Sequence, residues 1–213
     1  MKNLTYLKFE ILRTLRNRRF LIFSLVFPLV LFFAVAGPNK NVVVEGIHFL
    51  LDEVWPRLLQ ARPKIRAVII GRNPPVSLSD KIRERGVDVT LTGFVDDIRP
   101  HVAASHVYVI PLFVGSGTRI KAFEAMAMGR PVVSTSLGIE GLEVTHGEHF
   151  LRADDAAEFA SGILALLDDD AMRARIAGAA RGLMAAKFAW SEVARQFEAI
   201  CLRALDRRRA GAG

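Results

Sequence analysis

The sequence predicts an α/β protein in which a doubly wound parallel sheet follows one apolar N-terminal helix. Short apolar runs typical of strands alternate with amphipathic helical segments from about residue 66 onward. Turn-forming loops separate them, and each strand-helix unit is short. A run of seventeen uncharged residues, from Phe20 to Ala36, precedes this alternation and predicts the apolar helix.

The N-terminal segment combines that apolar run with positive charge. Residues 1–40 contain seven Lys or Arg residues and one Glu, and most of the cations precede Phe20. Cations before an apolar run keep the N-terminus in the cytoplasm, so we expect a single-pass membrane protein with a cytoplasmic N-terminus. Two alternatives stay open: the run lies at the cytoplasmic face without crossing, or it is a signal peptide cleaved after Ala36.

The remaining elements follow in order along the chain. A helix is expected near residues 45–61, kinked or split at Pro56. Strands are expected at residues 66–71, 87–92, 106–111 and 131–135, with a shorter one at 149–153. Helices are expected near residues 77–85, 98–105 and 118–128, and from Asp155 to the end with breaks at 168–170 and 187–190. Right-handed crossovers then place a ligand crevice at the C-terminal ends of the strands.

A glycine-rich loop opens the helix in residues 113–133, FVGSGTRIKAFEAMAMGRPVV. Its glycines allow close approach of a ligand to the backbone, and the first helical amides, near residues 118–120, favour an anion. Two cations and a carboxylate accompany the loop, which suits a phosphorylated sugar or nucleotide sugar. The candidate ligand-binding residues here are Gly115, Gly117, Thr118, Arg119, Lys121 and Glu124.

The sequence resembles the C-terminal, donor-binding half of a retaining GT-B glycosyltransferase of group 1, also called family 4. The segments that carry the resemblance are EGIHFLLDEVWP, AVIIGRNPP, VTLTGFVDDIRPHVAASHVYVIPL and KAFEAMAMGRPVVSTSLGIEGL, followed by Trp190. The resemblance as a whole covers residues 43–205. Residues 1–42 instead resemble the start of an ABC-2 type transporter permease, and residues 206–213 are expected to form a disordered tail.

The resemblance implies a Rossmann-like domain that binds a nucleoside-diphosphate sugar. The glycine-rich loop would meet the phosphates, Glu124 the ribose hydroxyls, and Phe94 the nucleotide base. Gly71 and Arg72, in the loop after the first strand, complete the predicted site. No metal is expected, because the core has no Asp-x-Asp carboxylate pair, and no cofactor is expected, since the nucleoside-diphosphate sugar is the donor substrate.

Three departures from the family's pattern limit the expected activity. Ser116 stands where many relatives have a glutamate, and the family's first strand and its phosphate-facing loop are replaced by the permease-like segment. We therefore expect a gap in the sheet between residues 66–71 and 106–111, which a short strand at residues 42–44 could fill. The acceptor-binding domain is also missing, so we expect little or no transfer without a separately encoded partner domain.

The alternative function is a non-catalytic, membrane-anchored remnant that at most binds a nucleotide, and a sugar epimerase is a third, weaker hypothesis. A nucleic-acid partner is not predicted, because beyond residue 40 the chain has 22 cationic and 21 acidic residues. Cys201 can form no intrachain disulfide and is expected to be buried. His146 and His149 are expected in a solvated turn, since no carboxylate or thiol set completes a metal site.

Overall fold

The computed structural model describes residues 40–115 and 117–210. From Val44 onward the chain forms one compact unit. Within the described ranges no helix is long and apolar enough to cross a membrane. The apolar run from Phe20 to Ala36 and the predicted departure at Ser116 lie outside the described residues, as do residues 211–213.

The described chain begins with a helical run in three parts. Helix α4 (Lys40–Phe49) continues into the π-helical turn η2 (Leu50–Val54) and then helix α5 (Trp55–Ala61). The run changes from π to α geometry at Trp55, next to Pro56, but it is not split at the proline. Pro56 lies in the first turn of α5, where its missing N–H is tolerated. The strand predicted at Val42, Val43 and Val44 is wrong: the three valines lie in α4, whose continuous helix overrides their strand propensity.

In the described residues, five strands form two separate parallel sheets. Strand β1 (Ala67–Ile70) pairs with β2 (Val89–Gly93), with Ala67 opposite Val89. The second sheet has the order β3-β4-β5, with the bounds Tyr108–Ile110, Val132–Ser134 and Leu151–Arg152. Helices α6 (Val76–Arg85), α7 (Arg99–Ala104) and α8 (Ile120–Ala127) connect the strands. Each predicted strand is therefore present, although shorter than expected.

The two sheets reproduce a doubly wound sheet with its central first strand left out. The usual order of such a sheet is 3-2-1-4-5-6, and the observed pairs β2-β1 and β3-β4-β5 fit that order on either side of position one. No ladder joins β1 to β3 within residues 40–210. Ala67 N–H and Gly71 N–H donate toward β2, so the backbone groups of Val68 and Ile70 face the free edge. The gap expected from the sequence is present in the described part of the chain.

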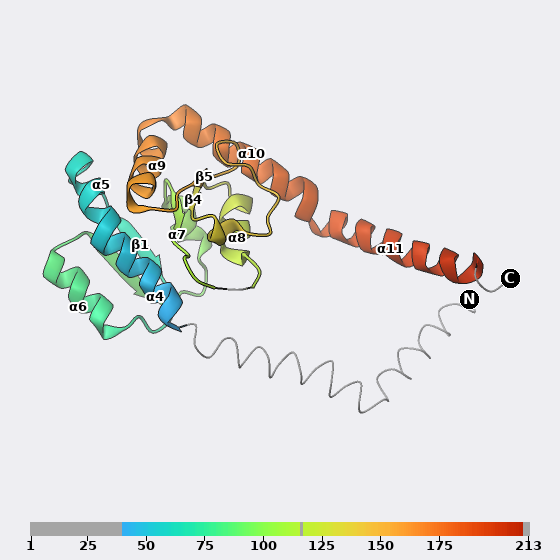
Figure 1. Cartoon of the computed structure of the whole chain (residues 1–213), viewed down its shortest axis with the longest axis horizontal. Helices are drawn as coiled ribbons and strands as arrows, with labels where there is room; N and C mark the ends of the chain where they lie inside the picture. The colour runs from blue at the N-terminus through green and yellow to red at the C-terminus, as the bar shows by residue number, and fades with distance from the viewer. Residues whose placement is uncertain (1–39, 116, 211–213) are drawn as a thin grey trace, which may run out of the picture. The chain divides into compact units, whose positions relative to one another are not determined.

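One apolar core holds the two sheets together. It includes Leu78 of α6, Val89 of β2 and Val133 of β4, together with Phe159 and Ile163 of helix α9 (Ala156–Asp168). A second cluster lies between α8 and helix α10 (Asp170–Phe188) and is lined by Ile110, Met126, Val132, Phe150 and Met184. Helices therefore cover both faces of the β3-β4-β5 sheet, and Figure 1 shows α9 and α10 close to β4 and β5.

Helix α11 (Trp190–Ala210) follows α10 and is largely exposed. The predicted break near residues 187–190 is confirmed, but residues 206–210, expected in a disordered tail, belong to this helix. Cys201 is exposed, so its predicted burial is wrong. The α11 face that includes Phe197 has no core to pack against in the described residues, and the helical period alone gave no way to know this.

Candidate functional site

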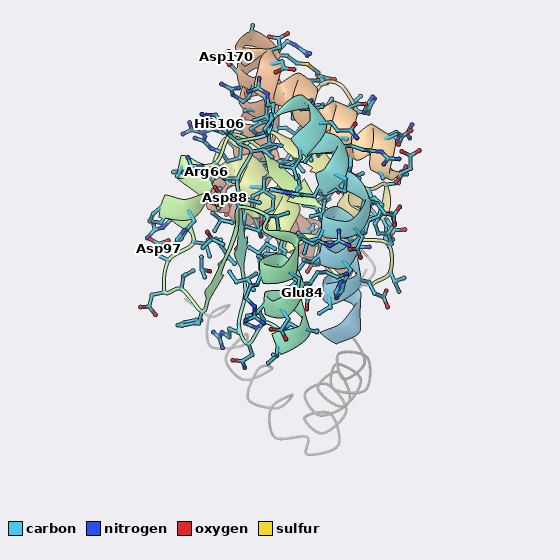
Figure 2. The ribbon with its side chains drawn as sticks, turned by 90° about the vertical axis from the view of Figure 1, so that its left-hand side faces the viewer. Arg66, Glu84, Asp88, Asp97, His106 and Asp170 are labelled. Atoms are coloured by element: carbon cyan, nitrogen blue, oxygen red, sulfur yellow. The ribbon has the colours of Figure 1, made fainter. Side chains whose placement is uncertain are left out.

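The predicted site residues lie in the loops that follow β1, β2, β3 and β4. Figure 2 shows Arg66, Asp88 and His106, which precede β1, β2 and β3, toward one end of the strands, and Asp97, which follows β2, toward the other. The loops after the strands therefore gather at one edge, as the crossover rule predicts. The gap between the sheets divides that edge into two groups of residues.

The first group comprises Arg72, after β1, and Phe94, after β2. The Arg72 guanidinium carbon lies 4.5 Å from the centre of the Phe94 ring, a cation–π contact that the two parallel strands bring about. Phe94 is 58% exposed. Its neighbour Asp97 accepts hydrogen bonds from the side chain and backbone of Arg99, which lowers the pKa of the Asp97 carboxyl. The exposed Phe94 ring and the Arg72 guanidinium together form a flat surface on which the planar ring of a ligand can stack.

The second group is built around the glycine-rich loop after β3. Gly115 and Gly117 have φ angles of 146° and 103°, so both require glycine, as predicted. The Phe113 ring packs edge-on against Phe49 of α4, with 4.6 Å between ring centres. Helix α4 also approaches this segment closely at Gly46: an added Cβ would lie 2.1 Å from the Pro111 carbonyl oxygen. Gly46 therefore sets the position of the loop, a role that the sequence pattern did not reveal.

Helix α8 starts at the end of this loop, with Arg119 as its N-cap residue. Ala122 N–H and Phe123 N–H both donate to the Arg119 carbonyl, which closes the first turn. Lys121 and Glu124 are exposed on α8, in keeping with contact to a ligand. Burial and the charge of Glu124 raise the pKa of Tyr108 in β3, so Glu124 lies near this strand.

Arg119 differs from the expectation of a free cation at the loop. Its side chain is only 6% exposed, and Nη2 donates to Glu140 Oε2 at 2.9 Å. Its Nε is buried and has no hydrogen-bond partner in the part of the chain that the structure describes. Glu140 follows β4 and was not singled out from the sequence, because a pair 21 residues apart carries no periodic signal.

The loop after β4 is held by hydrogen bonds between Ser136, in this loop, and Asp154, which follows β5. Ser136 donates through its backbone N–H and its Oγ to the two carboxylate oxygens of Asp154, at 2.6 and 2.7 Å. Burial acts to raise the pKa of Asp154, but the bonds from Ser136 outweigh it and the pKa is lowered. Gly138 has no room for a side chain, since an added Cβ would lie 2.3 Å from Ser134 Oγ. This loop is thus a rigid neighbour of the glycine-rich loop.

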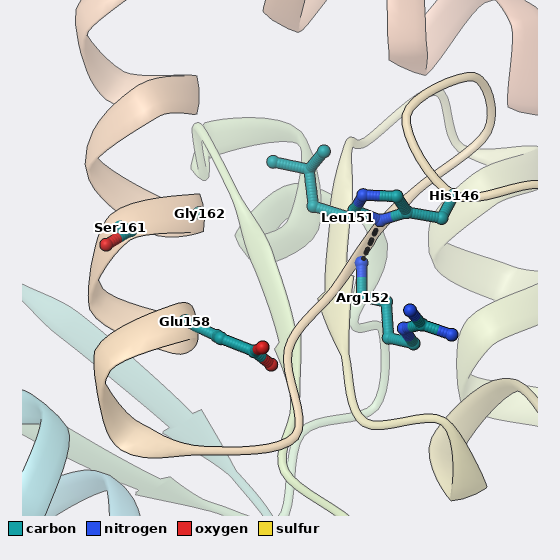
Figure 3. A pocket seen from close by; sticks show the side chains of 6 residues that line it. All are labelled: His146, Leu151, Arg152, Glu158, Ser161 and Gly162. Atoms are coloured by element: carbon teal, nitrogen blue, oxygen red, sulfur yellow. Dashed lines mark hydrogen bonds between the residues drawn. The ribbon is translucent and has the colours of Figure 1, made fainter.

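A shallow pocket of about 370 Å³ lies beside β5 and the start of α9, away from the predicted residues. Its wall includes Arg152, whose backbone N–H donates to His146 Nδ1, together with Glu158 and Ser161, as Figure 3 shows. These polar side chains are exposed. His149 Nδ1 accepts from Thr145 N–H in the same turn, whereas the donor to His146 belongs to β5; His149, expected in a solvated turn, has a side chain that is only 13% exposed. Among the described residues no group of His, Cys, Asp and Glu could hold a metal ion.

Comparison with known proteins identifies the family of this chain. A sequence profile of the family Glycosyl transferases group 1 matches residues 28–169, about two thirds of the chain. The chain belongs to this family. The match begins inside the segment that resembles a permease, so the permease-like origin of residues 1–42 stays a prediction.

Individual relatives agree with the family. A phosphatidyl-myo-inositol mannosyltransferase of Mycobacterium leprae is 31% identical over 156 residues, which cover 71% of this chain and 41% of that protein. The crystal structure of Anabaena Alr3699/HepE in complex with UDP matches 73% of this chain and 44% of its own, with 25% identity and a TM-score of 0.64. The C-terminal domain of a group 1 glycosyltransferase from Francisella tularensis shares the fold, with a TM-score of 0.59 at 23% identity, over 68% of this chain and 80% of that domain.

The chain spans less than half the length of the curated relatives that it matches, between 34% and 47%. Its α/β fold with parallel strands and its GT-B relationship agree with the sequence prediction. What the relatives do as whole proteins does not transfer to this chain without its own test.

Proposed function

We propose that this chain is the donor-binding half of a glycosyltransferase and binds a nucleoside-diphosphate sugar at the loops after β1 to β4. The observation that carries the proposal is the loop at Gly115 and Gly117, two positive-φ glycines followed at once by the start of α8. Backbone amides at a helix start favour an anion. HepE, a structural neighbour, is reported in complex with UDP.

The two groups of residues contact different parts of the donor. Lys121, exposed in the first turn of α8, supplies charge to the diphosphate, and Glu124, one turn further, accepts from ribose hydroxyls. Phe94 and Arg72 offer a stacking surface for the base. Gly71, which follows β1, keeps its surroundings open: no atom lies within 4 Å of where its Cβ would be.

Glycosyl transfer by this chain alone is expected to be absent or weak. A transferase must hold the acceptor against the donor, and the compact unit from Val44 onward corresponds to the donor-binding half alone. We propose that a separately encoded acceptor domain completes the enzyme. The alternative, a remnant that binds a nucleotide without transferring sugar, differs in one outcome: no added acceptor domain would restore transfer.

Calorimetric titration of the full chain with UDP, GDP and their sugars tests donor binding. Lys121→Gln should weaken binding about tenfold, because a charge-assisted hydrogen bond is lost. Lys64→Gln is the matched control, since Lys64 is exposed and precedes β1, away from the loops. Absence of binding at millimolar ligand, or an equal loss in both variants, would contradict the proposal.

Membrane attachment through residues 20–36 stays a prediction from the sequence. Protease accessibility of Arg207 in intact cells and in spheroplasts tests it. Cleavage only after the cytoplasm is exposed would contradict a single span that carries the domain across, and would favour attachment at the cytoplasmic face.

A further inference from the structure

We propose that Glu140 is an internal substitute for the donor's phosphate: it neutralises Arg119 in the free protein and is displaced when the donor binds. The inference rests on the proposed function and names a device that regulates the same site. Both residues lie at the C-terminal edge of the β3-β4-β5 sheet, Arg119 as the N-cap of α8 and Glu140 in the loop after β4.

Burial makes the pair asymmetric. The Arg119 side chain is 6% exposed, whereas that of Glu140 is 66% exposed. A guanidinium stays charged at any ordinary pH and needs an anionic partner when it is buried. Glu140 can swing into water at little cost, but Arg119 cannot leave its place between the two loops. Exchange of the partner therefore proceeds by movement of Glu140.

The guanidinium is only half used in the free protein. Nη2 donates to Glu140 Oε2 at 2.9 Å, while Nε, on the same edge of the planar group, is buried with no partner among residues 40–115 and 117–210. A buried donor without an acceptor is costly. A phosphate presents several oxygens and can accept from Nε and Nη2 together, which the observed single bond to Glu140 does not do.

The surroundings favour an incoming anion over the resident carboxylate. Lys121 lies two residues further along, and the turns of Gly115 and Gly117 precede Arg119. A diphosphate at this loop would meet all of these groups at once, whereas within the described residues the Glu140 carboxylate pairs with Arg119 alone. Glu140 thus covers the cation until a better partner arrives.

A double-mutant cycle on the full chain tests the exchange. Affinities for UDP and for inorganic pyrophosphate are measured by calorimetry for the unmodified chain, Glu140→Gln, Arg119→Gln and the double variant. If Glu140 occupies Arg119 nine tenths of the time, Glu140→Gln should bind about tenfold more tightly, and the gain should vanish when Arg119 is replaced. Glu143→Gln is the control, because Glu143 is exposed and pairs with Lys187.

Each outcome decides between the two claims. If Glu140→Gln binds like the unmodified chain, or gains no more than Glu143→Gln, or gains equally without Arg119, the exchange is refuted while donor binding stands. If neither the unmodified chain nor Glu140→Gln binds nucleotide, both claims fall. Should Arg119→Gln not fold, thermal unfolding replaces that arm: pyrophosphate should raise the Tm of Glu140→Gln more than that of the unmodified chain, and an equal rise refutes the exchange.

Discussion

Replacing Gly46 with alanine should destabilise the protein even though alanine is the better helix former. The added Cβ would lie 2.1 Å from the Pro111 carbonyl oxygen and 3.3 Å from its carbonyl carbon. Non-bonded carbon and oxygen atoms need at least about 3 Å, so α4 and the end of β3 must separate by about 1 Å. The obstacle is backbone, which cannot rotate out of the way as a flexible side chain could.

The magnitude follows from two opposing contributions. Overpacking of this kind costs about 1–3 kcal/mol, and a rigid carbonyl favours the upper part of that range. Alanine in place of glycine inside a helix contributes about 1 kcal/mol in the other direction. We expect Gly46→Ala to lower the free energy of unfolding by about 1–2 kcal/mol, and to weaken nucleotide binding as well, because Pro111 leads directly into the glycine-rich loop.

Urea unfolding at equilibrium measures the effect, with Gly178→Ala as the matched control. Gly178 is also inside a helix, α10, but no atom lies within 4 Å of its added Cβ. Gly178→Ala should therefore raise stability by about 0.5–1 kcal/mol. A Gly46→Ala protein as stable as the unmodified chain, or shifted by the same amount as Gly178→Ala, would refute the reasoning.

Three further changes have defined outcomes. Below about pH 4 the stability that Asp154 gains from Ser136 should be lost, because a carboxyl with a pKa below its ordinary 3.8 stabilises the fold only while it is ionised. Asp154→Asn should therefore flatten the acidic part of the stability profile measured by urea unfolding. A profile that is the same with and without Asp154 would contradict this role. Phe159→Ala should cost about 3–5 kcal/mol, since Phe159 is fully buried, whereas Phe197→Ala, at 68% exposure, should change stability by less than about 0.5 kcal/mol; similar losses in thermal unfolding would contradict the core assignment. Gly117→Ala should weaken UDP binding in calorimetry, because alanine is strained at a φ of 103°, and unchanged affinity would remove the loop from the site.

The order of elements was predictable from the sequence because each depends on local pattern. The strand at residues 131–135 was predicted from a short apolar run rich in β-branched residues, and the helix from residue 118 to 128 from an apolar period near 3.6; both are present, as β4 and α8. The glycine-rich loop was also predictable, since positive φ angles restrict the residue type at Gly115 and Gly117.

Where local preference met tertiary context, prediction failed. Val42, Val43 and Val44 favour a strand, yet they continue α4. Cys201 has the neighbours of a buried helical residue, yet no second element covers its side of α11 in the described residues. Both errors have one cause: local sequence shows which surface is apolar but not what lies against it.

By itself, then, the sequence determined the α/β class, the positions of five strands and the loop that favours an anion, because these depend on residue type and short-range spacing. The sequence also predicted the gap between β1 and β3, whereas packing alone revealed that Gly46 must be small and that Arg119 is held by Glu140. These depend on distances between residues 21 or more positions apart, which are set by how the strands and helices pack and not by any periodic pattern along the chain.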